Sequence, residues 1–189
     1  MTAVMISIHP KWCGLIASGK KVVEVRKTRP KLKVPFKCYI YCTKDRKQQF
    51  WTGKRYSYVD DRSHNAFDRC GNGKVIGEFV CDTYVIDRTF GHDPLLYAAA
   101  CMSVVDVAAY CLKSPMYGWH ISDLVIYDEP KELSKFKAIC RHYDDGRCGD
   151  CEYYDYANNE SYRYEECAVD GLKPITRPPQ SWCYVEVQE

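Results

Sequence analysis

The chain has 189 residues, enough for one domain with its own hydrophobic core, and its 46% of hydrophobic residues argues against general disorder. Its net charge of +2 is close to neutral, and no apolar run approaches the roughly 18 residues that a membrane helix needs. The opening MTAVMISIHP lacks the charged start and long apolar stretch of a signal peptide, so we expect a cytoplasmic protein.

The first part of the chain predicts three strands and one helix. A strand is expected at 4–7, and a helix should begin near Pro10 and end at Gly19, since proline suits the first turn of a helix and glycine its end. The valine-rich segment 21–27 predicts a second strand. The third, 36–42, alternates in polarity, and its half-exposed outer face is expected to carry Lys37, Tyr39 and Tyr41.

The rest of the chain predicts further strands separated by short helices. Residues 43–73 are polar and rich in turn-forming residues, which indicates a long excursion. Strands are predicted at 75–86, at 119–127 with a stop at Pro130, and at 182–187; helices are predicted at 95–101 and 103–112. This order favours an α+β fold, namely a small mixed β-barrel with short peripheral helices, over a parallel βαβ array. We expect one domain over 1–189.

The chain contains 12 cysteines. Without an export signal, a disulfide framework is a poor explanation for them. Five lie on apolar or alternating stretches and are expected to be buried thiols: Cys38, Cys42, Cys81, Cys101 and Cys111.

Four other cysteines have the spacing C-x7-C-x2-C-x15-C: Cys140, Cys148, Cys151 and Cys167. The thiolates of a C-x2-C pair can bind one tetrahedral ion from a single turn, and two more complete a closed structural zinc site. The residues between them are too polar to form a core, so zinc would order this cysteine-rich insert, 140–167. His142 could replace one cysteine. Free surface thiols and a redox-active pair are the alternatives.

Charge is unevenly distributed along the chain. Residues 1–60 hold 14 Lys or Arg against three acids, whereas residues 141–167 hold eight acids against three arginines. Basic groups that follow a phosphate backbone, beside aromatic faces that stack on unpaired bases, are typical of nucleic-acid binding. Such aromatic residues flank the basic segment 20–37: Trp12, Phe36, Tyr39, Tyr41, Phe50 and Trp51. The alternative is a solvated edge strand kept soluble by its lysines.

The stretch SIHPKWCGLIASGKKVVEVRKTRP resembles the opening of ASCH domains, which contain a G-x-K-x-x-E-x-R strand. The residues that fit this pattern are Gly19, Lys21, Glu24 and Arg26. VIGEFVCDTYVI resembles the central strand of that family, and YGWHISDLVIYDEPKELSKF resembles a later strand and turn. PITRPPQSWCYVE is similar to a bacterial and phage branch. The resemblance covers 4–42, 73–136 and 173–187.

The resemblance implies a barrel similar to the PUA fold, with a cleft lined by strand 21–26, and binding of RNA. Our first hypothesis is therefore a binding module that holds a single-stranded or flipped nucleotide in a basic cleft, which the zinc-stapled insert widens or covers as a lid. The expected contacts are Lys20, Lys21, Glu24, Arg26, Lys27 and Arg29.

A subset of the family consists of small amidohydrolases that remove acetyl groups from N4-acetylcytidine, with a Lys after the Gly, a Thr three residues further on and a Glu from a later helical region. Lys21 matches the Lys, Glu24 stands where the Thr is expected, and no residue is assigned to the later Glu. The second hypothesis is such a hydrolase, or a weak ribonuclease, with Lys21 and Glu24 as catalytic residues. In the third, the acidic cysteine insert docks a protein partner.

Several of these residues also have simpler explanations. Glu24 and Arg26 alternate on one face of a strand, where a salt bridge alone would account for them. The same alternation places Lys21 on the other face unless the strand bulges. His120 lies on an apolar strand and is expected to be a core or cleft-wall residue rather than a catalytic one.

Overall fold

The computed structural model describes residues 1–52, 69–87, 93–111, 115–139 and 172–188, and it shows an α+β fold that is mainly sheet with three short helices. The largest sheet has seven strands in the order β11-β10-β12-β1-β3-β6-β9. Its strands are β1 (Thr2–Ile8), β3 (Phe36–Cys42), β6 (Val75–Cys81), β9 (Ser122–Lys131), β10 (Lys137–Ile139), β11 (Leu172–Pro174) and β12 (Trp182–Glu186). The pair β1–β3 is parallel and the other pairs of this sheet are antiparallel.

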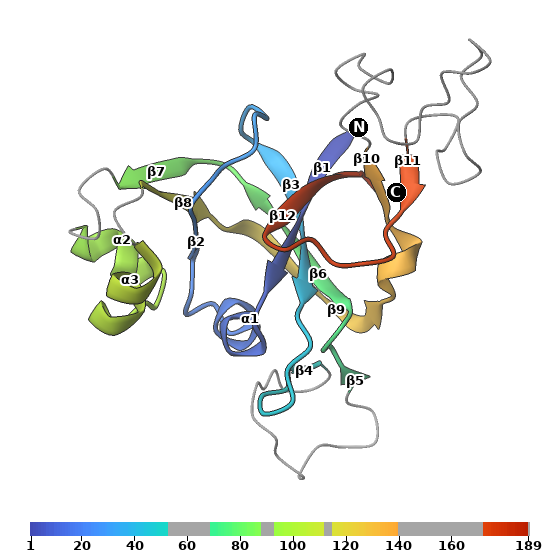
Figure 1. Cartoon of the computed structure of the whole chain (residues 1–189), viewed down its shortest axis with the longest axis horizontal. Helices are drawn as coiled ribbons and strands as arrows, with labels where there is room; N and C mark the ends of the chain where they lie inside the picture. Colours follow the sequence, from blue (N-terminus) through green and yellow to red (C-terminus); the bar gives the residue numbers. More distant parts are fainter. Residues whose placement is uncertain (53–68, 88–92, 112–114, 140–171, 189) are drawn as a thin grey trace, which may run out of the picture.

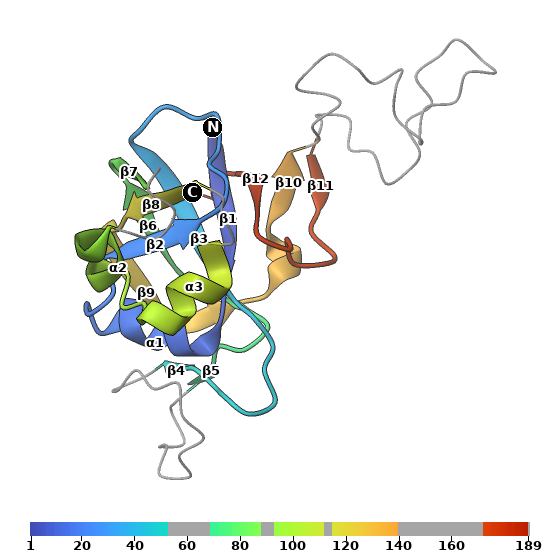
Figure 2. The ribbon, with the colours of Figure 1, turned by 60° about the vertical axis from the view of Figure 1, so that its left-hand side comes forward.

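A second sheet has the order β2-β8-β7, formed by β2 (Val23–Arg26), β8 (Met116–His120) and β7 (Tyr84–Asp87). A two-stranded ribbon joins β4 (Trp51–Thr52) and β5 (Arg69–Cys70). The helices are α1 (Pro10–Ala17), α2 (Pro94–Ala99) and α3 (Val104–Cys111), with one 3₁₀ turn at Leu133–Lys135. In both views β2, α2 and α3 lie on one side of β1, and β10 and β11 lie on the other (Figure 1 and Figure 2).

Two chain segments that were each predicted as one strand contribute one strand to each of the two larger sheets. The segment predicted at 75–86 breaks after Cys81, so that β6 pairs with β3 whereas β7 pairs with β8. The segment predicted at 119–127 breaks at Ile121, with β8 before it and β9 after it. Strands that change sheets at such a corner cover two sides of one core without a separate connection.

Both faces of β1 and β3 are buried, which corrects the predicted outer face of β3. Tyr39 and Tyr41 have 0% and 3% of their surface exposed, and they pack with Met5, Phe136 and Val185 in a core cluster of their own. The opposite face of the same strands contributes Ile6, Cys38 and Ile40 to the first core cluster. The segment around β10 and the 3₁₀ turn supplies this second cover, so the tyrosines are not available to stack on bases.

A closed barrel is not found among the described strands. The seven-stranded sheet ends at β9 and β11, and pairing with the three-stranded sheet is absent from the described ladders. The predicted α+β class with short helices is confirmed, whereas the described strands do not show the predicted barrel. β9 also runs through Pro130 instead of ending before it, because an edge strand tolerates a residue without an N–H group.

Four cysteines that the structure describes are unbridged thiols, as predicted: Cys13, Cys38, Cys42 and Cys81. Cys38, Cys42 and Cys81 are fully buried, whereas Cys101 is half-buried, and Cys111 falls outside what the structure describes at side-chain level. Within the described ranges, no helix is both long and apolar enough to cross a membrane.

Candidate functional site

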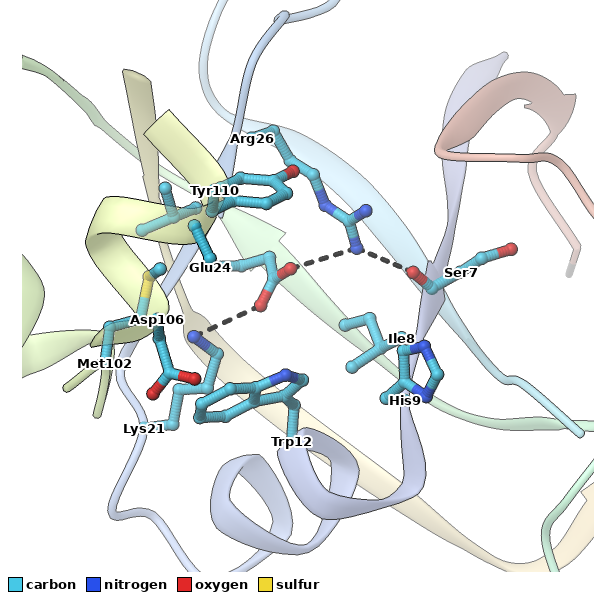
Figure 3. Close-up of a pocket in the computed structure, with 12 residues that line it drawn as sticks. Ser7, Ile8, His9, Trp12, Lys21, Glu24, Arg26, Met102, Asp106 and Tyr110 are labelled. Atoms are coloured by element: carbon cyan, nitrogen blue, oxygen red, sulfur yellow. Dashed lines mark hydrogen bonds and ion pairs between the residues drawn. The ribbon is translucent and has the colours of Figure 1, made fainter. Parts of the chain in front are cut away.

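A pocket of about 310 Å³ opens where the end of β1 meets α1, β2 and α3. Figure 3 shows the side chains of Lys21, Glu24 and Arg26 pointing toward one another in this pocket. The lining residues are Ser7, Ile8, His9, Trp12, Lys21, Glu24, Val25, Arg26, Met102, Asp106, Ala109 and Tyr110.

Three charged side chains form a buried cluster in this pocket. Glu24 Oε1 lies 2.9 Å from Arg26 Nη2, and Glu24 Oε2 lies 3.3 Å from Lys21 Nζ (Figure 3). The exposed fraction is 6% for Glu24, 9% for Arg26 and 3% for Lys21. A buried cluster with one carboxylate for two cations contributes little to folding because of the desolvation of its members. Such clusters are typical of functional sites.

Lys21 reaches this cluster because it precedes β2 instead of belonging to it. α1 ends in a turn in which Gly19 has φ of 72°, and the backbone N–H of Lys21 donates to Leu15 O. β2 begins only at Val23, so the strand alternation that would place Lys21 opposite Glu24 does not apply. Lys21 Nζ also donates to Ala100 O over 2.8 Å, which anchors the ammonium at the C-terminal end of α2.

Arg26 is held from the other side of the pocket. Its Nη2 atom donates to Ser7 O over 2.6 Å, at the end of β1. Ser7 is itself fixed by the C-terminal segment, since its Oγ donates to Pro179 O and its N–H donates to Ser181 O. Arg26 Nε is buried without a hydrogen-bond partner among the described residues, an arrangement that lowers stability by about 1–3 kcal/mol.

Aromatic rings form two walls of the pocket. The Trp12 ring, from α1, has Lys21 Nζ 5.0 Å and Lys11 Nζ 4.4 Å from its centroid. The Tyr110 ring, from α3, has Lys27 Nζ 5.1 Å from its centroid. In Figure 3 the Glu24 carboxylate lies between the two rings.

Asp106 is a pocket residue that the sequence analysis missed. Its Oδ2 accepts hydrogen bonds from the hydroxyl and the N–H of Ser103, which caps α3, and these bonds together with nearby Lys11 lower the pKa of the carboxyl. The signal in the sequence was the S-x-x-D pattern at the start of the predicted helix 103–112. With Lys21, Arg26 and Glu24, Asp106 gives the lining two cations and two carboxylates apart from His9.

The pocket brings together only some of the residues predicted to bind nucleic acid. Lys21, Glu24 and Arg26 line it, but Lys20, Lys27 and Arg29 do not. Lys20 is exposed, and the guanidinium of Arg29 lies 5.3 Å from the centroid of the Tyr84 ring. Of the flanking aromatic residues, Trp12 alone lines the pocket, whereas Phe36, Tyr39, Tyr41 and Phe50 are core residues.

Two further predictions concern residues away from this pocket. His120 is half-exposed and pairs with Asp82 over 2.7 Å, and this contact lowers the pKa of Asp82. The four cysteines predicted to bind zinc lie outside the described residues. No metal-binding group of three or more His, Cys, Asp or Glu is found in the part of the chain that the structure describes.

The fold is mainly β within the α+β class, and its pocket combines a buried ion cluster with aromatic walls. The chain belongs to the ASCH domain family, whose model matches residues 6–145. ASCH domains have a PUA-like fold and are generally associated with RNA binding. The resemblance to ASCH domains, which was inferred in part from the Gly19–Arg26 motif, is therefore confirmed. The matched region ends within the predicted insert, 140–167.

Solved structures of an ASCH protein from Zymomonas mobilis are similar to this chain. One has 20% sequence identity and a TM-score of 0.47, and the match covers 69% of this chain and 73% of that chain. A variant of that protein with phenylalanine in place of a tyrosine has 17% identity and a TM-score of 0.46, with coverage of 69% and 76%. No curated protein gives a significant match to the chain.

Proposed function

We propose that the protein is an RNA-binding module whose pocket holds one unpaired nucleobase with its sugar. The observation that carries this proposal is the convergence of Lys21, Glu24 and Arg26 in one recess beside the Trp12 ring. A pocket of about 310 Å³ is at the small end of the range for ligand sites, which suits a nucleoside better than a larger ligand.

The lining matches the chemistry of a base more closely than that of a phosphate. An indole can stack on any base, and the carboxylates and cations offer acceptors and donors for the polar edge of the base. Two carboxylates, Glu24 and Asp106, oppose Lys21 and Arg26, so a phosphate inside the pocket would be repelled as well as attracted. The sequence predicted a basic cleft, whereas this proposal describes a pocket in which two carboxylates balance two cations.

Competition binding tests this function. A labelled, unstructured RNA of about eight nucleotides should bind the protein, and free nucleosides should displace it if they occupy the same pocket. Trp12→Ala should weaken RNA binding by about 1–3 kcal/mol because it removes a stacking surface. Trp51→Ala is the matched control, since Trp51 does not line the pocket. Equal effects of the two substitutions would reject the pocket as the binding site.

The alternative is hydrolysis of an acylated nucleoside such as N4-acetylcytidine, or weak ribonuclease activity. The observation in its favour is Asp106, which places a carboxylate from a later helix in the pocket of Lys21 and Glu24. Glu24 lacks the hydroxyl of the threonine expected at its position, and Lys21 Nζ already donates to Ala100 O. Incubation with N4-acetylcytidine, followed by detection of cytidine, tests this activity; turnover that survives Lys21→Ala would exclude Lys21 as catalytic residue.

A structural zinc ion at Cys140, Cys148, Cys151 and Cys167 remains our proposal for the insert, supported by the C-x2-C pair among four thiols. Metal analysis of the purified protein by mass spectrometry tests it, and less than one zinc per two chains would argue against it. A pull-down with and without a chelator tests the docking of a protein partner by the insert. A cytoplasmic location is supported by the free, buried thiols of the described core.

A further inference from the structure

We propose that Lys11 and Lys27 bind the two phosphates that flank the nucleotide in the pocket, so that the ligand is an internal nucleotide of a continuous RNA strand. This inference rests on the proposed function and specifies its ligand. Lys11 lies outside the G-x-K-x-x-E-x-R pattern, and its position beside the pocket becomes apparent only from the structure.

The two lysines are placed by the two aromatic walls of the pocket. Lys11 Nζ lies 4.4 Å from the centroid of Trp12, and Lys27 Nζ lies 5.1 Å from the centroid of Tyr110. Since Trp12 comes from α1 and Tyr110 from α3, the ammonium groups belong to two different sides of the recess. Figure 3 places the two rings on either side of the Glu24 carboxylate.

Neither ammonium is used by the fold in the way that the buried cations are. Lys21 and Arg26 are bound to Glu24 and to backbone carbonyls, whereas Lys11 and Lys27 have no ion pair with another described residue. Lys11 lies near enough to Asp106 to help lower the pKa of that carboxyl, but the two described side chains form no ion pair. Within the part of the chain that the structure describes, both lysines can therefore meet an anion from solution.

The charge balance of the pocket decides where the parts of a nucleotide go. Glu24 and Asp106 repel a phosphate inside the pocket. Lys11 and Lys27 do not line the pocket, but they lie against the Trp12 and Tyr110 rings that do, and they attract phosphates there. A neutral base enters most favourably, with its 5′ and 3′ phosphates left outside. The two lysines do not raise the affinity for a free nucleoside. Both raise the affinity for an RNA strand that continues in both directions from the pocket.

The salt dependence of RNA binding tests this arrangement. For an unstructured RNA of about eight nucleotides, Lys11→Gln and Lys27→Gln should each reduce the slope of log K against log salt by about 0.7, and the double variant by about 1.4. Lys137→Gln is the matched control, since it removes one exposed lysine from β10, on the other side of β1 (Figure 2). Its slope should equal that of the unchanged protein.

A second measurement separates the failure of this inference from that of the proposed function. A free nucleoside has no phosphate. The RNA should therefore be displaced from the Lys11→Gln variant and from the unchanged protein at the same fraction of pockets occupied by nucleoside. RNA binding with unchanged salt slopes in both lysine variants would overturn the inference and leave the pocket function intact. Failure of nucleosides to displace RNA, combined with an unaffected Trp12→Ala variant, would overturn the pocket function itself.

Discussion

The Nζ atom of Lys21 lies 3.3 Å from Oε2 of Glu24, and both side chains are almost completely buried. Arg26 contacts the other oxygen of the same carboxylate, so one anion offsets two cations away from solvent. The electrostatics of the pocket therefore depend most on the Glu24 carboxylate.

Glu24→Ala should lower the free energy of unfolding by about 3–5 kcal/mol, because it leaves two buried cations without their carboxylate. Urea denaturation measures this change. The matched control is Glu132→Ala, since the Glu132 side chain is 59% exposed in its pair with Lys74 and should contribute less than about 1 kcal/mol. Similar losses of stability in both variants would contradict a buried cluster around Glu24.

Ser103→Ala should lower the free energy of unfolding by about 1 kcal/mol at neutral pH, since Ser103 caps α3 through Asp106. The pKa of Asp106 is lowered from its ordinary value of 3.8 in the folded protein, chiefly by hydrogen bonds from Ser103. The stabilising contribution is therefore complete above 3.8 and disappears as the pH falls through the lowered pKa. Denaturation curves over this range should show that the difference between the variant and the unchanged protein narrows in acid.

The background variant Asp106→Asn provides the control for that experiment. Without the titrating carboxyl, the effect of Ser103→Ala should be the same at neutral and acid pH. A difference that narrows equally in both backgrounds would assign the pH dependence to another group.

Phe136→Ala should lower the free energy of unfolding by about 3–5 kcal/mol, because Phe136 is fully buried against Tyr39, with ring centroids 5.0 Å apart. The control is Leu95→Ala, which removes a side chain from a residue that is 82% exposed and should change stability by less than about 0.5 kcal/mol. Thermal or urea unfolding checks both variants. A small effect of Phe136→Ala would show that the second face of β3 is not a core.

Alkylation should distinguish the thiols of the folded protein. Burial, followed by the hydrogen bond with Cys42, raises the pKa of Cys13, and burial raises the pKa of Cys38. Both should resist iodoacetamide at pH about 8, whereas half-buried Cys101 should react first among these three. Peptide mass spectrometry after brief labelling measures the order, and rapid labelling of Cys13 would contradict its burial.

Local patterns predicted the elements that depend on neighbouring residues. Pro10 and the turn at Gly19 marked α1, and the strand predicted at 36–42 has the same bounds as β3. The break of 75–86 into β6 and β7 was not visible, because both halves are apolar enough for a strand and only the pairing with β3 or β8 separates them. The outer face of β3 was wrong for a similar reason, since the cover supplied by Phe136 lies almost a hundred residues away in the chain.

The sequence by itself determined the family, the α+β class and the identity of Lys21, Glu24 and Arg26 as site candidates, because these follow from a short, continuous motif. Only the tertiary structure decided that the three side chains meet, that Trp12 and Asp106 join them, and that Lys20 and Arg29 do not. The physical reason is that side-chain convergence depends on where α1 turns and on how α3 packs over β2, and these positions are set by contacts between residues far apart in the chain.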